Sequence, residues 1–312
     1  VLAGAQEYRT AMASFAQMPN LDVWYARMDI EKALSTLAGG VTNKSIKKAK
    51  KNVAKARTRD SMQALEKLTE VVDGQRRIIS DPPLIVPLAD LIKNNPQFGE
   101  VMSDQIRAII RGYRRTLQTD RQILLEEFNF VEMAHKVVGV GSVGTRAWIL
   151  LFTGRDGNDP LFLQAKEAQA SVLEAYAGRS RYKNAGQRVV AGQRLMQSAS
   201  DIFLGWHRQT GVDGVARDYY VRQLRDWKGS ADVDNMPLDA LATYARMCAW
   251  TLAKAHARSG DRIAIAAYLG GGTVFDRAVA DFAAAYADQN EKDYAALQQA
   301  VADGRVTAQT GL

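Results

Sequence analysis

The feature that most constrains the fold is a glycine-rich segment between two strand-like runs. The segment Gly139-Val140-Gly141-Ser142-Val143-Gly144 overlaps the β-type run 136–140 and leads into the run 146–153, which is rich in branched and aromatic residues. Its G-x-G-x-x-G spacing is shared by unrelated phosphate sites and by ordinary turns, so the context decides between them. A dinucleotide-binding turn leads from a strand into a helix, whereas this segment leads into a strand. We therefore expect a glycine-rich β-hairpin.

In kinases, a glycine-rich hairpin covers the nucleotide phosphates and a lysine on the third strand contacts them. Lys166 lies in the strand-like run 161–166, where that lysine is expected. A carboxylate on the following helix holds the lysine, and Glu174 is the best-placed acid. Glu167 is expected to point to the opposite face, because side chains alternate along a strand. An ordinary hairpin with a solvent-facing lysine is the alternative that these residues leave open.

The pattern along the chain predicts an α+β protein in which a β-lobe interrupts a mostly helical one. We expect a helical region at 1–130, a β-lobe at 131–230 and C-terminal helices at 231–312. In the helical region, Tyr8, Met12, Phe15 and Met18 share one helix face, and further helices are expected near 60–72, 100–118 and 119–128. The β-lobe is expected to be a five-stranded antiparallel meander, with strands at 136–140, 146–153, 161–166, 202–208 and 218–224 and a helix at about 185–199. From Pro237 onward we expect one long helix and then two more, at about 274–288 and 291–303.

The chain carries 41 basic and 34 acidic residues, and most of this excess is concentrated in one segment. The basic segment 44–59 contains eight lysines and arginines and no acid, so the remaining chain sums to about −1. An exposed charged helix is the simpler interpretation, because the segment has no aromatic residue to stack on a base. Nucleic-acid binding through this segment is the alternative, and it would be weakened by salt.

Composition excludes several classes of site. The single cysteine, Cys248, excludes an intrachain disulfide and a cysteine-based zinc site, and the three histidines are scattered, so we expect no metal site. No apolar run approaches the roughly 20 residues that span a bilayer, and no signal-like N-terminus is visible. We therefore expect a cytoplasmic protein without a membrane partner. The chain begins with Val1 rather than Met, which we interpret as a sign of truncation.

Several longer motifs resemble a bacterial family of uncharacterised proteins, the domain of unknown function 2252. These motifs are Leu21–Tyr25, Val137–Arg146, Pro160–Ala168, Gly186–Val190, Asp218–Asp226 and Ala255–Asp261, and together they extend over essentially the whole chain. The family is grouped with protein-kinase-like folds, near the aminoglycoside phosphotransferases. The resemblance implies a protein-kinase-like β-lobe on a helical lobe, ATP and Mg²⁺ as cofactors, and transfer of a phosphoryl group to an unknown acceptor.

The resemblance also implies a set of nucleotide-binding residues. The glycine segment and its flank would hold the phosphates, Lys166 would pair with them, and Glu174 would orient the lysine. Backbone groups of Gln223 and Leu224 would meet the adenine. The complete expected set is Gly139, Gly141, Ser142, Val143, Gly144, Thr145, Lys166, Glu174, Gln223 and Leu224.

The catalytic carboxylates of the family are not found at matching positions. A Gly-Asp-x-His-x-x-Asn segment and an Asp-Phe-Asp segment, which lie upstream of the glycine loop in this family, do not occur in residues 1–312. We therefore expect the catalytic residues upstream of Val1 and expect this chain alone to be inactive. Asp261 and Asp281 are the alternative within the chain. A non-catalytic nucleotide-binding module, or pseudokinase, is the alternative function, and no motif indicates the oligomeric state.

Overall fold

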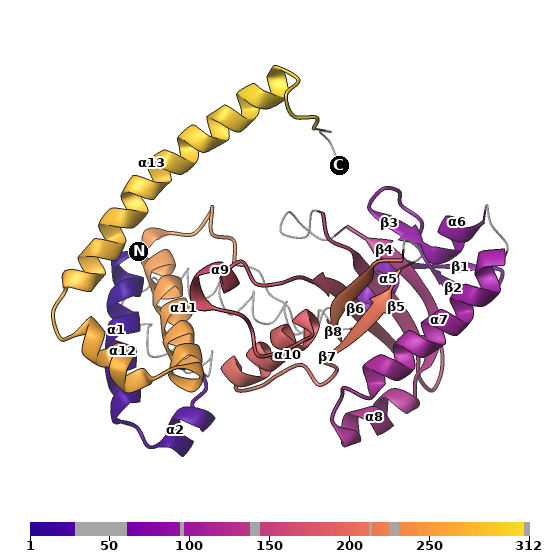
Figure 1. The fold of residues 1–312 in the computed structure, drawn as a ribbon, viewed down its shortest axis with the longest axis horizontal. Coiled ribbons are helices and arrows are strands. Elements are labelled where there is room, and N and C mark those ends of the chain that lie inside the picture. The colour runs from indigo at the N-terminus through magenta and orange to yellow at the C-terminus, as the bar shows by residue number, and fades with distance from the viewer. Residues whose placement is uncertain (29–60, 94–96, 138–143, 212–213, 225–230, 309–312) are drawn as a thin grey trace. The chain divides into compact units, whose positions relative to one another are not determined.

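A computed structural model describes residues 1–28, 61–93, 97–137, 144–211, 214–224 and 231–308 (Figure 1). These residues form two compact units, which we describe separately. The helical unit contains residues 1–28, 195–198 and 231–308, and the sheet unit contains the other described residues, between 61 and 224. The basic segment 44–59 and residues 138–143 of the glycine segment lie outside the described residues.

The sheet unit is built on a six-stranded antiparallel sheet. Its strands, in order across the sheet, are β3 (Ile85–Pro87), β4 (Asn129–Lys136), β5 (Ala147–Thr153), β6 (Pro160–Ala168), β8 (Ala216–Gln223) and β7 (Gly205–Thr210). The expected mixture of helices and an antiparallel sheet is confirmed. The five-stranded meander is wrong, because β3 adds a sixth strand and β8 lies between β6 and β7. The chain crosses over after β6, so the hairpin of β7 and β8 pairs with β6 through its second strand.

The N-terminal part of the sheet unit is less helical than expected. Its helices are α5 (Ser61–Leu68), α6 (Leu88–Ile92), α7 (Gln97–Arg114) and α8 (Thr119–Glu126). The predicted helix at 60–72 ends at Leu68, and a two-stranded hairpin of β1 (Thr69–Val72) and β2 (Gln75–Ile78) follows. Asp73 and Gly74 form its two-residue turn with φ of 50° and 74°. An Asp-Gly pair adopts such positive angles readily, and this pair was the overlooked hairpin signal.

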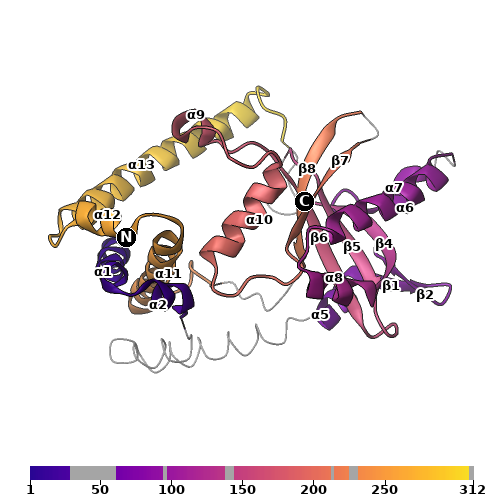
Figure 2. The ribbon, with the colours of Figure 1, turned by 60° about the horizontal axis from the view of Figure 1, so that its bottom comes forward.

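The central strands are buried on both faces, and each face has its own core. Ile149, Leu151 and Phe162 pack with Ala64 and Leu65 of α5, and we call this side of the sheet the α5 face. The residues at alternate positions, among them Leu150, Phe152 and Leu163, pack with Tyr113 of α7 on the opposite side, the α7 face. Figure 2 shows α7 and α8 against the sheet.

Two short helices follow β6 in the chain, α9 (Glu174–Ala177) and α10 (Ala185–Met196), the second at the predicted place. The Asn184 side chain caps α10 by accepting the Gln187 N–H at 2.9 Å, and Asp218 of β8 accepts the Ala185 N–H at 2.7 Å. At the other end of α10, the Arg194 guanidinium lies 6.0 Å from the ring centroid of Trp206 in β7. Asp218 and Trp206 both point to the α5 face, so α10 covers that face along β7 and β8.

The helical unit is formed by both ends of the chain. It contains α1 (Leu2–Gln17), α2 (Asn20–Tyr25), α11 (Leu238–Ser259), α12 (Arg262–Leu269) and α13 (Val274–Ala302). Met12 and Phe15 are buried with Ala253 and Ala257 of α11, which confirms the predicted buried face of the first helix. The two predicted helices at 274–288 and 291–303 are one continuous helix, because neither glycine nor proline separates them.

Polar contacts between distant parts of the chain stabilise the helical unit. The Arg9 guanidinium forms an ion pair with Asp276, whose side chain is 1% exposed, at 2.9 Å. The Tyr8 hydroxyl lies 2.7 Å from Nδ1 of His256. Among the described helices none is by itself long and apolar enough to span a bilayer; α12 and α13 meet that test only as a pair, bent by 81°.

The close approach of α10 to β8 depends on Gly186, because a Cβ atom there would overlap the carbonyl oxygen of Tyr219. We predict that Gly186→Ala lowers the free energy of unfolding by about 1–3 kcal/mol, since the backbone contact cannot move aside. Gly157→Ala is the matched control, because nothing lies within 4 Å of a Cβ atom at that position. Chemical denaturation measures both variants. An unchanged midpoint for Gly186→Ala would contradict this packing.

Candidate phosphate-binding face

Lys166 occupies the middle of the sheet, on the α5 face. In β6 it is opposite Ala147 of β5 and Tyr220 of β8, so its side chain shares a face with that of Tyr220. The next residue, Glu167, points to the α7 face, in agreement with the expected alternation. There its carboxylate accepts the Arg146 backbone N–H at 3.1 Å and lies 3.9 Å from the Arg217 guanidinium. Glu167 is therefore engaged by arginines on the face that Lys166 does not share.

A second cation, Arg222 of β8, lies on the same face as Lys166. Tyr220 is the cross-strand partner of Lys166, and Arg222 lies two residues beyond Tyr220 in β8. Lys166 and Arg222 are therefore diagonal neighbours, whose Cα atoms are typically roughly 7–8 Å apart. Within the described part of the chain, neither side chain forms an ion pair, and the buried Nε of Arg222 has no hydrogen-bond partner. A buried guanidinium N–H without an acceptor is costly, so this position favours an anionic ligand.

The electrostatics of Lys166 reflect the same arrangement. Burial lowers the pKa of the Lys166 ammonium, and the nearby positive charge of Arg222 lowers this pKa further. Each effect disfavours the charged form, and a bound anion would oppose both. The pair Lys166 and Arg222 therefore has the charge, the face and the incomplete hydrogen bonding of an anion site. Arg222 was not among the predicted site residues, because the predicted meander did not place the strand of Arg222 next to the strand of Lys166.

The described end of the glycine segment, Gly144, leads into β5, the strand that pairs with the lysine strand β6. Gly144 adopts a φ of 80°, which favours glycine, and Ala147 three residues later is the cross-strand partner of Lys166. Thr145 lies between them. The other expected phosphate-binding residues, Gly139, Gly141, Ser142 and Val143, lie outside the described residues. The phosphate-binding role of the glycine segment thus stays a prediction; the structure shows that its described end leads into β5.

Glu174 forms contacts other than the one expected. Its carboxylate lies 3.6 Å from the Arg188 guanidinium of α10 and accepts the Ser171 N–H at 3.4 Å. No ion pair between Glu174 and Lys166 is present in the described structure. Glu174 thus links α9 to α10, and its expected role in orienting Lys166 stays a prediction.

The two expected adenine-contacting residues lie where β8 ends. The backbone N–H of Gln223 donates to the Asp201 carboxylate at 2.6 Å, and the N–H of Leu224 donates to the Phe162 carbonyl at 2.8 Å. Both donors are therefore used within the protein. A base at this edge would have to be recognised through other groups, so the adenine contact also stays a prediction.

The two alternative catalytic aspartates lie in the helical unit, and each has a structural explanation. Asp261 is the N-cap of α12, where one carboxylate oxygen accepts the Ile263 and Ala264 N–H groups at 3.0 Å. Asp281 is an exposed residue within the continuous helix α13. In the described residues, no group of three or more histidine, cysteine, aspartate or glutamate side chains is arranged to hold a metal ion.

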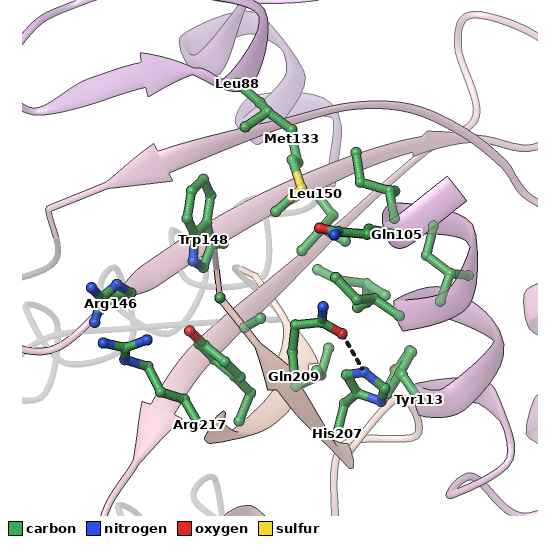
Figure 3. A pocket seen from close by; sticks show the side chains of 18 of the residues that line it. Leu88, Gln105, Tyr113, Met133, Arg146, Trp148, Leu150, His207, Gln209 and Arg217 are labelled. Carbon is green, nitrogen blue, oxygen red and sulfur yellow. Dashed lines mark hydrogen bonds between the residues drawn. The ribbon is translucent and has the colours of Figure 1, made fainter. Parts of the chain in front are cut away.

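A large cavity lies on the other side of the sheet. It has a volume of about 540 Å³ and lies on the α7 face, under α6 and α7 (Figure 3). Its lining is mostly apolar, and Lys166 is not part of it. Judged by cavity size alone, a ligand site would be expected on the α7 face. The cations Lys166 and Arg222, which form no ion pair within the described residues, instead favour an anion site on the α5 face. Charge rather than apolar volume recognises a phosphate, so the α5 face is the candidate phosphate-binding face.

Comparisons with known proteins agree with the resemblance in the sequence. A family model described as "Uncharacterized protein conserved in bacteria (DUF2252)" matches residues 1–300. No curated protein and no solved structure matches the chain. The match extends over both the helical unit and the sheet unit. The chain therefore belongs to this uncharacterised bacterial family, DUF2252.

Proposed function

We propose that the sheet unit binds the phosphate groups of ATP on the α5 face, in a kinase-like β-lobe, as part of an ATP-dependent phosphotransferase. The observation that supports this most is the pair Lys166 and Arg222, two cations on one sheet face with an unpartnered buried Nε. Phosphate oxygens are strong acceptors for both kinds of side chain. The lysine would act as a compact charge, and the arginine would supply directed N–H donors.

The order of elements supports the kinase-like assignment. Strands β4 and β5 flank the glycine segment, β6 carries Lys166 as the third strand, and α10 follows before β7 and β8. A glycine-rich hairpin followed by a lysine strand and a helix is the order found in protein kinases. Here β3 is an addition at the edge next to β4, away from Lys166.

Mg²⁺ would accompany the nucleotide. This ion is commonly held by one or two carboxylates together with the substrate phosphates, so a protein cage of several ligands is not needed. Lys166 and Arg222 fit the phosphates rather than the metal, since both are cations. Bound in this way, Mg²⁺ would neutralise phosphate charge, while the two protein cations position the phosphate chain.

A non-catalytic nucleotide-binding module is the second candidate. The observation that favours it is that the Asp261 carboxylate already caps α12, while Asp281 is surface-exposed on α13. A general base must lie within hydrogen-bond reach of the proton that it removes, and a carboxylate engaged in capping is poorly suited to this. Measurement of phosphoryl transfer from γ-labelled ATP to any acceptor separates the two candidates, since both require nucleotide binding.

One prediction of this proposal concerns binding of Mg-ATP to the full chain. We expect calorimetric titration to show binding of Mg-ATP and of inorganic triphosphate, and much weaker binding of adenosine. Lys166→Met and Arg222→Gln should each reduce the affinity for triphosphate by about tenfold or more, because each removes a charge-assisted hydrogen bond worth roughly 1.5–3 kcal/mol.

Arg155→Gln is the matched control for this titration. Arg155 lies on the exposed turn between β5 and β6 and pairs with Asp156 at 3.0 Å, so its removal changes the net charge equally without altering the α5 face. Its affinity for triphosphate should equal that of the unsubstituted chain. Equal losses in all three variants would show only an effect of net charge and would contradict the proposed site.

A further prediction of this proposal concerns the stability of the Lys166→Met variant. Lys166→Met should raise the melting temperature near neutral pH by roughly 1–3 °C while weakening triphosphate binding, because it removes a half-buried cation next to Arg222. The folded-state pKa of Lys166 is lowered, so the charged form destabilises the fold below that pKa. This penalty disappears as the pH rises toward the unfolded value. The advantage of the methionine variant should therefore shrink at alkaline pH. A variant less stable than the parent at pH 7 would contradict the proposed electrostatic strain.

A further inference from the structure

The cavity on the α7 face is long relative to its volume of about 540 Å³. Residues of five adjacent strands, β4, β5, β6, β8 and β7, form its floor. Neighbouring strands lie roughly 4.8 Å apart, so this floor extends over roughly 19 Å. The helix α7 forms the roof, and Leu88 and Leu91 of α6 lie at the side next to β4. These dimensions match an extended chain better than a bulky ring system.

The lining of the cavity is mostly apolar. Its apolar residues come from both α7 and the sheet and include Ile106, Ile109, Met133, Leu150, Leu163 and Val221. A concave site of this size with apolar walls is typical of small-molecule binding sites. An apolar chain in this space would contact the lining atoms and remove their surface from water, which is favourable.

Close packing against the edge strand β7 fixes the height of α7 above the sheet. A Cβ atom on Gly112 of α7 would lie 2.5 Å from the His207 ring of β7. A Cβ atom on Gly205 of β7 would lie 2.6 Å from the Thr116 hydroxyl and 2.7 Å from the Tyr113 ring. Neither helix nor strand can therefore carry a larger residue at these contacts. The cavity is thus a preformed part of the fold.

The charged side chains of the lining are engaged within the protein. Figure 3 shows Arg146 and Arg217 beside each other at one end of the cavity. One carboxylate oxygen of Glu167 lies 3.7 Å from the Arg146 guanidinium and 3.9 Å from that of Arg217. The Arg217 guanidinium also donates to the Val215 carbonyl at 3.2 Å. Both arginines thus serve structural contacts, and we assign no ligand charge to them.

The uncharged polar side chains differ in how they are used. The Gln209 oxygen lies 3.3 Å from Nε2 of His207, and the Gln209 NH₂ group donates to the Thr210 carbonyl at 2.9 Å. Burial lowers the pKa of His207, so its imidazole is neutral at pH 7. In contrast, the half-buried Gln105 of α7 has no side-chain hydrogen bond to any described residue. Figure 3 shows its amide extending from α7 toward Leu150.

We propose that this cavity binds an uncharged, elongated apolar molecule with one hydroxyl or carbonyl group, such as a medium-chain aliphatic alcohol. Its chain lies between α7 and the sheet, and its polar group bonds the Gln105 amide, which offers both donors and an acceptor. A charged group would have to give up its hydration in apolar surroundings, which is costly. This site lies on the face opposite Lys166, so the proposal goes beyond nucleotide binding and does not depend on it.

1-Decanol is the test ligand. When the full chain is titrated by calorimetry into 1-decanol below its solubility limit, we expect saturable binding of one decanol per chain. 1-Octanol should bind at least about tenfold more weakly, because each buried methylene contributes roughly 0.8 kcal/mol. Decanoate and decyltrimethylammonium carry ten-carbon chains with opposite charges, and each should bind at least about tenfold more weakly than decanol. Absence of decanol binding, or a charged ligand that binds as tightly as decanol, would overturn the proposal.

Two variants test the walls and the polar contact of the site. Ile109→Trp should fill the cavity and reduce decanol affinity by about tenfold, whereas Ile123→Trp, at a position 60% exposed on α8, is the control for added bulk. Gln105→Leu should reduce decanol affinity by about fivefold, because it removes one uncharged hydrogen bond. Circular dichroism confirms that each variant is folded. If Ile109→Trp and Gln105→Leu bind decanol as the parent does, the ligand is elsewhere and the proposal is wrong.

Binding of triphosphate provides an independent reference. Ile109→Trp should leave triphosphate affinity unchanged, because its position is on the α7 face. Lys166→Met should leave decanol affinity unchanged for the corresponding reason. Loss of decanol binding together with retained triphosphate binding, or the reverse, therefore identifies which of the two proposals fails.

Discussion

The double-sided burial of β5 and β6 is the constraint on which the rest of the sheet unit depends. Ile149, Leu151 and Leu163 are fully buried although they point to opposite faces, because α5 covers one face and α7 the other. Side chains alternate along a strand, so a shift of one residue would move every side chain of that strand to the opposite face and disrupt the packing of both cores. The register of the central strands is therefore strongly determined, and every polar residue in them is assigned to one face.

This alternation separates two kinds of chemistry in one sheet. Lys166 is directed to the α5 face, where Arg222 is its diagonal neighbour, while Glu167 is directed to the α7 face, where it meets Arg146 and Arg217. If Lys166 and Glu167 shared a face, they would neutralise each other. Their separation leaves Lys166 without an ion pair among the described residues, while the opposite face carries a large, mostly apolar cavity. The α5 face is therefore the face on which we propose a phosphate ligand.

Strands with a clear local residue pattern could be predicted from the sequence, whereas the pairing of strands that are distant in the sequence could not. Strands β5 and β6 were placed within about two residues, since branched residues and turn signals bound them, and Lys166 lies in a strand, as predicted. The adjacency of β6 and β8 is a tertiary contact without a local signal, so Arg222 was not recognised as a neighbour of Lys166. The β1–β2 hairpin was missed despite its Asp73-Gly74 signal, because the surrounding residues were interpreted as a helix.

The pKa of the Lys166 ammonium, measured by nuclear magnetic resonance of ¹³C-labelled lysine, tests the central claim most directly. The Lys166 signal is assigned by its loss in Lys166→Arg. In the free chain we expect this pKa below that of an exposed lysine, since burial and Arg222 both disfavour the charge. Addition of inorganic triphosphate should raise it, because a bound anion stabilises the ammonium. A pKa that is normal in the free chain, or that does not change when triphosphate is bound, would contradict an anion site at Lys166 and Arg222.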